Sequence, residues 1–566
     1  MHLPRRTFLK AAAASSAAAG CADPAQDRVF PQGVGSGDPT PDSVLLWTRV
    51  ESEGSQTVQW ELASDEGLWS VVARGEATAE AETDHTLRVQ VDGLSSGKTY
   101  WYRFTARGVK SVVGRTRTAP APDADVKVRL ALASCQDFGG RYFHAWDALL
   151  ERDDVDFVLF IGDYIYETLG HLAGELPVER TVELPDGLEL DDPIKGKVAA
   201  RTLADYRALY RAYRADPDLR AMHARFPVVA LWDDHEFAND AWGEHATDFD
   251  DARGDERDPA RRAAATRAFY EYQALRRPFT PEAGFPNDLS VQRAVRWGRH
   301  ADFTLLDERY HRDDHLIPEG VVDRDVGHFG KNTAFGARTF VVKDAFDAKE
   351  AVAAPTMLGA PQRDWAIAQV RGSDATWKLL VSPLIVAQLV LDLTGYAQLP
   401  DLLRKRFYFK TDQWDGFRTE RRLLLEVVAD IENVAVLSGD LHGFYAATLH
   451  ADFDAPSPPL AVEYATSAIS APAVDVQLDK VIGSDVFLNA LGLGKLVPEF
   501  DQNLLAANPH LRHSVSTKNG LAIVELGADE LRVTFVESSE VTRPTREVSR
   551  ETTFRTPAGT KRVERL

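Results

Sequence analysis

The stretch DFVLFIGDYIYE, residues 156–167, decides the fold of this chain. Its first half is a continuous apolar run, typical of a strand buried on both faces, and Asp163 and Tyr166 follow directly. Three other apolar runs end in the same way: VRLALASCQ (128–136), VVALWDDHEFAND (228–240) and VAVLSGDLHG (434–443). Polar side chains at strand ends converge on one crevice in an open α/β sheet. The sequence therefore predicts an α/β domain with a site at these strand ends.

The residues at the strand ends are of the types that bind metal ions. An aspartate after a strand is most often a helix cap or a turn residue, a buried tyrosine packs in a core, and a free cysteine behaves as a small hydrophobe. Sulfur, oxygen and nitrogen donors delivered from several strand ends are, however, what a metal centre needs. The candidates are Cys135, Asp163, Tyr166, Asp234, Asp440 and His442, with His235 beside them.

Local geometry narrows the roles of these residues. Asp440 and His442 are two residues apart, so they share one face if the chain is extended there. Asp233 and Asp234 face opposite ways if the strand before them continues, so only one of them would bind a metal ion directly. We expect Asp234 to be that ligand. His235 is left free to act on a substrate.

The composition disfavours binding to nucleic acid or to anionic lipid, and it disfavours a disulfide framework. The chain has 566 residues, with 65 Lys and Arg against 86 Asp and Glu, and its formal net charge is −21. Such a charge disfavours nonspecific attraction to nucleic acid or anionic lipid, and no specific nucleic-acid binding is expected. The two cysteines, Cys21 and Cys135, lie in very different contexts, which makes a disulfide framework improbable.

The N-terminus, residues 1–26, resembles a twin-arginine export signal. Arg5 and Arg6 precede a weakly apolar Ala and Ser stretch and then small residues, in the order typical of signal peptides. Cys21 follows an Ala-Ala-Gly sequence that resembles a lipoprotein box, so both a lipid anchor and simple cleavage stay open. We expect the twin-arginine export machinery as a partner, and a periplasmic, extracellular or surface-anchored protein.

Two domains are predicted after the signal. Residues 30–120 contain short β-rich runs at regular spacing, which indicates a β-sandwich. Within it LSSGKTYWYRF, with Tyr100, resembles the tyrosine corner of fibronectin- and Ig-like sandwiches. Residues 126–545 alternate helical and strand patterns, as in an α/β domain, with closing β-rich runs that would complete a second sheet. Charged, helix-forming segments at 171–226 and 240–290 are expected to wall the site.

The four strand-end motifs depart together from the pattern of common metallophosphoesterases. That pattern has four motif blocks. The segments of this sequence at the four blocks contain Cys135, Gly162-Asp163 through Tyr166, Asp234-His235-Glu236 and Gly439-Asp440-Leu441-His442. These departures, with GVGSGDPTPDSVLLWTRV near the start, resemble the PhoD-type alkaline phosphatase and phosphodiesterase family. The resemblance implies an α/β (α+β) chain, in which the sandwich precedes a calcineurin-like αββα catalytic domain.

The resemblance also implies a cofactor and a reaction. Fe³⁺ would be bound by Cys135, Asp163, Tyr166 and His442, with Asp163 bridging to a second ion such as Ca²⁺. The remaining oxygen ligands would be, in this sequence, Asp234, Asn239 and Asp440. A metal-bound hydroxide would hydrolyse a phosphate monoester or diester, in a small molecule or a polymer, as a secreted phosphoric ester hydrolase.

Two side chains are predicted to act on the substrate. His235 would protonate the leaving oxygen. Arg309, at the end of another strand-like run, could clamp the phosphate, with a structural ion pair as the alternative. Two rival functions stay open: a non-haem iron oxidoreductase, since the same donors support redox iron, and a noncatalytic surface-anchored binding protein on the same fold.

Overall fold

The computed structural model describes residues 24–169, 178–192, 196–246, 256–317, 338–401, 403–455, 457–484, 489–490, 492–538, 540–543 and 548–566. The predicted export signal lies outside them up to residue 23, so Arg5, Arg6 and Cys21 have no structural description here. Within these ranges the model has no helix with the length and apolar character that crossing a membrane requires.

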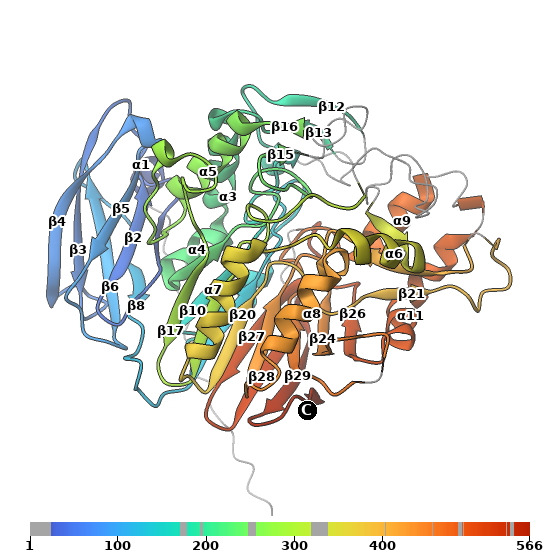
Figure 1. Ribbon diagram of the computed structural model, residues 1–566. Coiled ribbons are helices and arrows are strands. Elements are labelled where there is room, and N and C mark those ends of the chain that lie inside the picture. Colours follow the sequence, from blue (N-terminus) through green and yellow to red (C-terminus); the bar gives the residue numbers. More distant parts are fainter. Residues whose placement is uncertain are drawn as a thin grey trace, which may run out of the picture.

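The largest sheet has ten strands and runs through most of the molecule (Figure 1). Its order is β30 (Glu564–Arg565), β29 (Val548–Pro557), β28 (Glu530–Ser538), β27 (Gly520–Leu526), β9 (Val128–Ala133), β10 (Phe157–Ile161), β14 (Val228–Leu231), β1 (Val34–Gly37), β2 (Val44–Arg49) and β5 (Thr86–Val91). Strands β9, β10 and β14 are parallel, so their carboxyl ends meet at one edge.

A second sheet of seven strands packs on the first. Its order is β17 (Arg293–Trp297), β18 (Ala301–Leu305), β20 (Trp377–Val381), β23 (Val434–Ser438), β25 (Ala461–Ala465), β24 (Phe444–Leu449) and β26 (Leu511–Val515). Leu132 and Phe157 of the first sheet share one buried apolar cluster with Phe303 and Leu437 of the second. Burying the apolar faces of both sheets together is what holds the two layers in contact.

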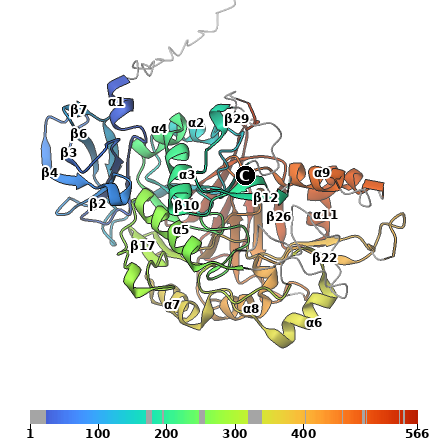
Figure 2. The same cartoon turned by 90° about the horizontal axis from the view of Figure 1, so that it is seen from above.

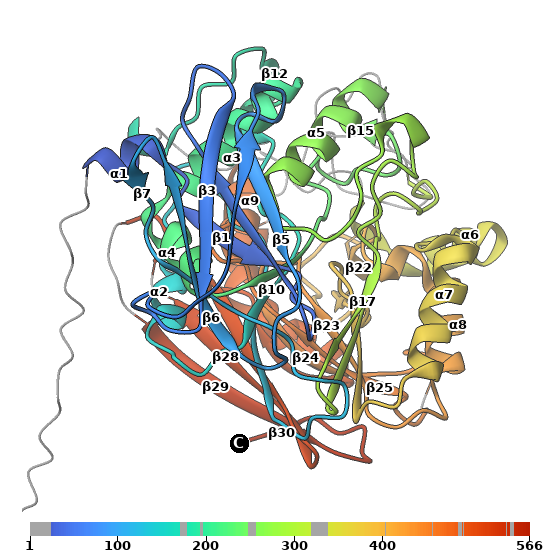
Figure 3. The same cartoon turned by 90° about the vertical axis from the view of Figure 1, so that its left-hand side faces the viewer.

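Helices cover the outer faces of both sheets, which completes the expected αββα arrangement. On one side lie α2 (Ala145–Leu150), α3 (Leu203–Ala215), α4 (Pro217–Arg225) and α5 (Pro259–Tyr272). On the other lie α7 (Gly359–Gly372), α8 (Arg418–Val427) and α11 (Phe500–Ala507), whose apolar residues join those of the seven-stranded sheet. Figures 2 and 3 both show α2 and α4 on the opposite side of the sheets from α7 and α8.

The described residues also contain further helices and small sheets. They are α1 (Pro24–Val29), α6 (Lys343–Ala353) and α9 (Val474–Ser484), and the strands of three small sheets: β11 (Thr168–Leu169) with β13 (Gly196–Ala199) and β12 (Leu188–Asp192); β15 (His245–Ala246) with β16 (Glu256–Arg257); and β19 (Thr339–Val342) with β22 (Arg406–Lys410) and β21 (Val390–Asp392).

The N-terminal region is strand-rich, as predicted, and its two sheets enclose a separate apolar core. A sheet of β3 (Gln56–Ala63), β4 (Val71–Ala79), β6 (Thr99–Ala106), β7 (Val109–Lys110) and β8 (Gly114–Arg117) faces β1, β2 and β5. The hydroxyl of Tyr100 accepts a hydrogen bond from the backbone N–H of Ser95 (2.9 Å), which is the contact expected of a tyrosine corner.

Two connections differ from the sequence prediction. Strand β1, which lies in the predicted sandwich, pairs in parallel with β14, so the sandwich and the α/β region share one sheet. Of the closing runs, β25 lies in the second sheet as predicted, whereas β27 and β28 do not, because β27 pairs antiparallel with β9 in the first. Strand pairing between distant segments is set by tertiary packing, which a local sequence pattern does not encode.

Candidate metal centre

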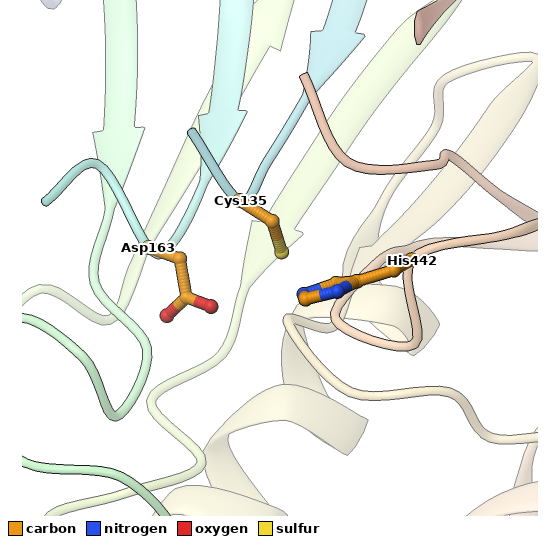
Figure 4. A group of neighbouring side chains, drawn as sticks. All are labelled: Cys135, Asp163 and His442. Atoms are coloured by element: carbon orange, nitrogen blue, oxygen red, sulfur yellow. The ribbon is translucent and has the colours of Figure 1, made fainter. Parts of the chain in front are cut away.

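The strand-end motifs meet at the carboxyl edge of β9, β10, β14 and β23, as predicted. The sulfur of Cys135, a carboxylate oxygen of Asp163 and a ring nitrogen of His442 all lie within 4.8 Å of one another. Figure 4 shows these three side chains pointing toward a common centre. The hydroxyl of Tyr166 is 3.2 Å from Asp163 Oδ2 and 3.1 Å from His442 Nε2, so the phenol joins the same group.

A second group of donors contains only carboxylates. Asp163, Asp233, Asp234 and Asp440 each offer an oxygen within the same mutual distance of 4.8 Å. Asp163 belongs to both groups, so it lies where a bridging ligand would be needed. Asp233 is engaged otherwise, since two guanidinium nitrogens of Arg309 donate to its carboxylate.

The backbone at the site is held in an uncommon conformation. Cys135, Asp163, Asp440 and His442 have φ angles of 58°, 56°, 64° and 47°, in the left-handed region that few non-glycine residues adopt. The expected extended segment from Asp440 to His442 is therefore wrong, because β23 ends at Ser438 and the chain turns there. Both side chains still reach the centre, through the turn rather than through strand alternation.

The expected opposition of Asp233 and Asp234 is also wrong. Strand β14 ends at Leu231, before both aspartates, so alternation no longer governs their directions and both carboxylates reach the cluster. The backbone N–H of Asp240 donates to Oδ2 of Asp234 at 2.5 Å. The other carboxylate oxygen of Asp234, Oδ1, is buried without a hydrogen-bond partner, although Arg309 Nη2 lies 3.5 Å away. A buried acceptor of this kind is available for a cation.

The carboxylates and the thiol at this site are buried and close together, so ionising them without a counterion is energetically costly. Burial, together with the charges of Asp234, Glu236 and Asp440, raises the pKa of Asp163 well above its usual value. Burial and the Asp163 and Asp440 carboxylates likewise raise the pKa of the Cys135 thiol. Bound cations would stabilise the ionised forms of both groups. The donor set therefore fits metal ions: a mixed sulfur, nitrogen and oxygen group beside an oxygen-only group.

His235 is positioned by a residue that sequence reasoning missed. Its Nδ1 lies 2.6 Å from Oε2 of the fully buried Glu167, and its ring packs on that of Tyr166 with centroids 4.0 Å apart. Burial opposes a charge on the imidazole, but Glu167, Asp163 and Asp234 outweigh it and raise the pKa of His235 well above its usual value. Glu167 immediately follows the Tyr166 motif, which was the available signal.

A second missed acid shapes the loop itself. The carboxylate of Glu236 accepts hydrogen bonds from the backbone N–H groups of Asp163 (3.0 Å), Tyr164 (2.6 Å) and Asp233 (2.8 Å). These bonds connect the turn after β10 to the turn after β14. Glu236 therefore holds together the two loops that carry Asp163 and Asp234.

Arg309 is placed differently from the predicted phosphate clamp. It is 2% exposed, donates to Asp233, and binds both oxygens of Asp412 at 3.0 and 3.1 Å. Its guanidinium is thus engaged in a buried ion-pair network with Asp233 and Asp412, and a structural ion pair was the alternative considered from the sequence.

A cavity opens over the metal-ligand candidates. Its lining residues include the predicted Tyr166, His235, Asn239, Asp440 and His442, and also Asp240, Thr339, Phe409, Lys410, Leu441, Pro472, Val474 and Gln477. The segments 171–226 and 240–290, expected to wall the site, contribute only Asp240 among the described residues. Six other lining residues come from β19, β22 and the segment 472–477, which lie far away in the sequence.

Asn239 is close to the centre, but its role as a ligand stays a prediction. The residue lines the cavity, and its backbone N–H donates to Oε1 of Glu167 at 2.8 Å. The same carboxylate therefore contacts both His235 and the loop that carries Asn239.

The chain was compared with known proteins. A family described as PhoD-like phosphatase matches residues 130–535, and its N-terminal domain matches residues 13–120. Alkaline phosphatase D of Bacillus subtilis (strain 168) is 31% identical over 442 residues, which is 75% of this chain and 66% of the relative, just under two thirds of its length.

The chain is also similar to solved structures. A structure of PhoD has a TM-score of 0.73 and 26% identity, covering 95% of this chain and 92% of that one. The purple acid phosphatase PPD1 from yellow lupin seeds has a TM-score of 0.47 and 9% identity, covering 92% and 73%.

Proposed function

Because the chain belongs to the PhoD-like phosphatase family, we propose that it is a metal-dependent phosphoric ester hydrolase acting through the strand-end centre. The observation that carries the proposal is the position of Asp163, whose buried carboxylate is shared by a sulfur- and imidazole-bearing group and by a carboxylate-only group. Two metal ions that prefer different types of ligand could be held side by side in this way.

The two groups of donors suit different ions. Cys135, Asp163, Tyr166 and His442 would hold Fe³⁺, because three of the four donors can become anionic. Asp163, Asp234, Asp440 and Asn239 would hold Ca²⁺ or another hard cation through oxygen. When bound, such ions would polarise the phosphoryl group and lower the pKa of water from about 15.7 to about 7.

His235 would supply the proton for the leaving alcohol. Glu167 accepts from Nδ1, so Nε2 is the ring nitrogen left to face the cavity, and the Tyr166 ring fixes the plane of the imidazole. General acid catalysis of this kind typically contributes about 10²–10⁴ in rate. His442 is oriented in the same manner, because its Nδ1 donates to the carbonyl of Pro472 at 2.6 Å and leaves Nε2 toward Tyr166.

The same proposal includes export by the twin-arginine pathway, with lipidation at Cys21 and simple cleavage as the two alternatives for the signal. It rests on Arg5, Arg6 and the small residues before Cys21. Fractionation of cells that express the full chain tests it: the protein should be found outside the cytoplasmic compartment and stay inside when both arginines are replaced by lysine. Equal export of the two forms would overturn this part.

Metal analysis joined to absorption spectroscopy tests the centre. A tyrosinate bound to Fe³⁺ should give a visible charge-transfer band, and Tyr166→Phe should remove it while lowering phosphate release. Tyr164→Phe is a matched control, because this neighbouring buried tyrosine contacts His223 (2.7 Å) on the far side of the loop. No band in iron-replete protein, or a band that survives in Tyr166→Phe, would refute the ferric assignment.

A further inference from the structure

Lys410 brings a positive charge to the wall of the cavity, a feature that the strand-end motifs did not predict. It ends β22, and its side chain is 19% exposed. Among the described residues that line the cavity it is the one lysine or arginine. Arg309, Arg312 and Arg338, the guanidinium groups of the neighbouring network, are 2%, 0% and 0% exposed at their side chains, so their charges do not face the opening.

Of the three acids near Lys410, Asp240 and Asp412 have other cations nearby. Its Nζ lies 3.0 Å from Asp240 Oδ1 and 4.0 Å from carboxylate oxygens of Asp412 and Asp440. Asp412 also accepts hydrogen bonds from Arg309 and Arg312 at 3.0–3.1 Å. The Lys410 ammonium has three N–H donors, so it can contact Asp240 and still present a donor to the cavity.

We propose that Lys410 binds a nonbridging oxygen of the substrate phosphoryl group and thereby favours phosphate monoesters over diesters. The inference rests on the proposed phosphoesterase function and names the preferred substrate class. A monoester carries close to two negative charges at neutral pH, because its second pKa is about 6, whereas a diester carries one. Lysine is a common point-charge ligand for phosphate. The ammonium forms no covalent bond, and its role is positioning and charge.

The experiment compares two substrates with the same leaving group, 4-nitrophenyl phosphate and bis(4-nitrophenyl) phosphate. Lys410→Met should lower kcat/KM for the monoester by about 10- to 100-fold, the usual range for losing a charged hydrogen bond, and for the diester by less than about 3-fold. Lys410→Arg should retain part of the monoester activity. Inorganic phosphate, followed by calorimetry and as a competitive inhibitor, should bind Lys410→Met at least about 10-fold more weakly.

Lys343→Met is a matched control. Lys343 is a buried lysine that also binds two aspartates, Asp347 and Asp454, both at 2.6 Å, but it lies on α6 and outside the cavity lining. Its replacement should change stability without changing the ratio of monoester to diester hydrolysis. Should Lys410→Met fold poorly because Asp240 keeps only the more distant Arg338, at 3.8 Å, as a cation, the double variant Lys410→Met with Asp240→Asn removes both members of the closer pair.

The possible results separate this inference from the function on which it rests. Equal losses for both substrates, with reduced metal content, would mean that Lys410 only balances the acidic cluster, and would overturn the inference. Unchanged binding of inorganic phosphate would overturn it too. Wild-type protein that hydrolyses neither substrate would refute the phosphoesterase function, while the phosphate-binding comparison would still decide the role of Lys410.

Discussion

Glu167→Gln is the sharpest test of how His235 is positioned. The change keeps the size of the side chain but removes the carboxylate charge that lies 2.6 Å from Nδ1 of His235. A hydrogen bond to a charged group contributes about 1.5–3 kcal/mol, and about 1.4 kcal/mol corresponds to a tenfold change in rate. We therefore expect kcat to fall by about 10- to 100-fold. KM should change little, because Glu167 does not line the cavity.

The assay is steady-state hydrolysis of a phosphate ester by four proteins: wild type, Glu167→Gln, His235→Ala and the double variant. If Glu167 acts through His235, adding Glu167→Gln to His235→Ala should cause almost no further loss. Glu271→Gln is the matched control, because it removes another buried carboxylate, bound by Arg207 and Arg267, on α5. It should change stability but not kcat.

Two results would refute this reasoning. One is a kcat for Glu167→Gln within twofold of the wild type. The other is an equal further loss in the His235→Ala background, which would show that Glu167 acts on something other than the imidazole. Metal content measured on the same samples separates either result from simple loss of the ions.

Two further predictions concern stability. Burial lowers the pKa of His510 to about 4, so the unfolded chain takes up a proton near pH 6.5 before the folded protein does. Between pH 6.5 and 4, the free energy of unfolding should therefore fall by about 3 kcal/mol more in wild type than in His510→Gln. The glutamine can still donate a hydrogen bond to the Gln388 carbonyl. Equal acid sensitivity of the two proteins in thermal melts would contradict this. Arg309→Met leaves Asp233 without its buried cation and removes one of the two arginines that bind Asp412, so it should cost about 3–5 kcal/mol in denaturant unfolding, whereas loss of a phosphate clamp would mainly raise KM.

The sequence alone located the centre because its evidence is local. Apolar runs that match β9, β10, β14 and β23 end within a few residues of Cys135, Asp163, Asp234 and Asp440. A buried strand needs such a run, and its end is where the chain can turn and present polar groups. The convergence of several such ends could therefore be predicted without knowing which strands are neighbours.

The tertiary structure decided the features that depend on pairs of residues far apart in the chain. Arg309 carries no sequence mark that tells a phosphate clamp from an ion pair, and only the approach of Asp233 and Asp412 settles it. Lys410 lies 175 residues beyond His235 in the sequence, yet both line one cavity. Sequence periodicity reports which side of an element is buried, whereas distances between elements, and hence charge balance, follow from how the sheets and loops pack.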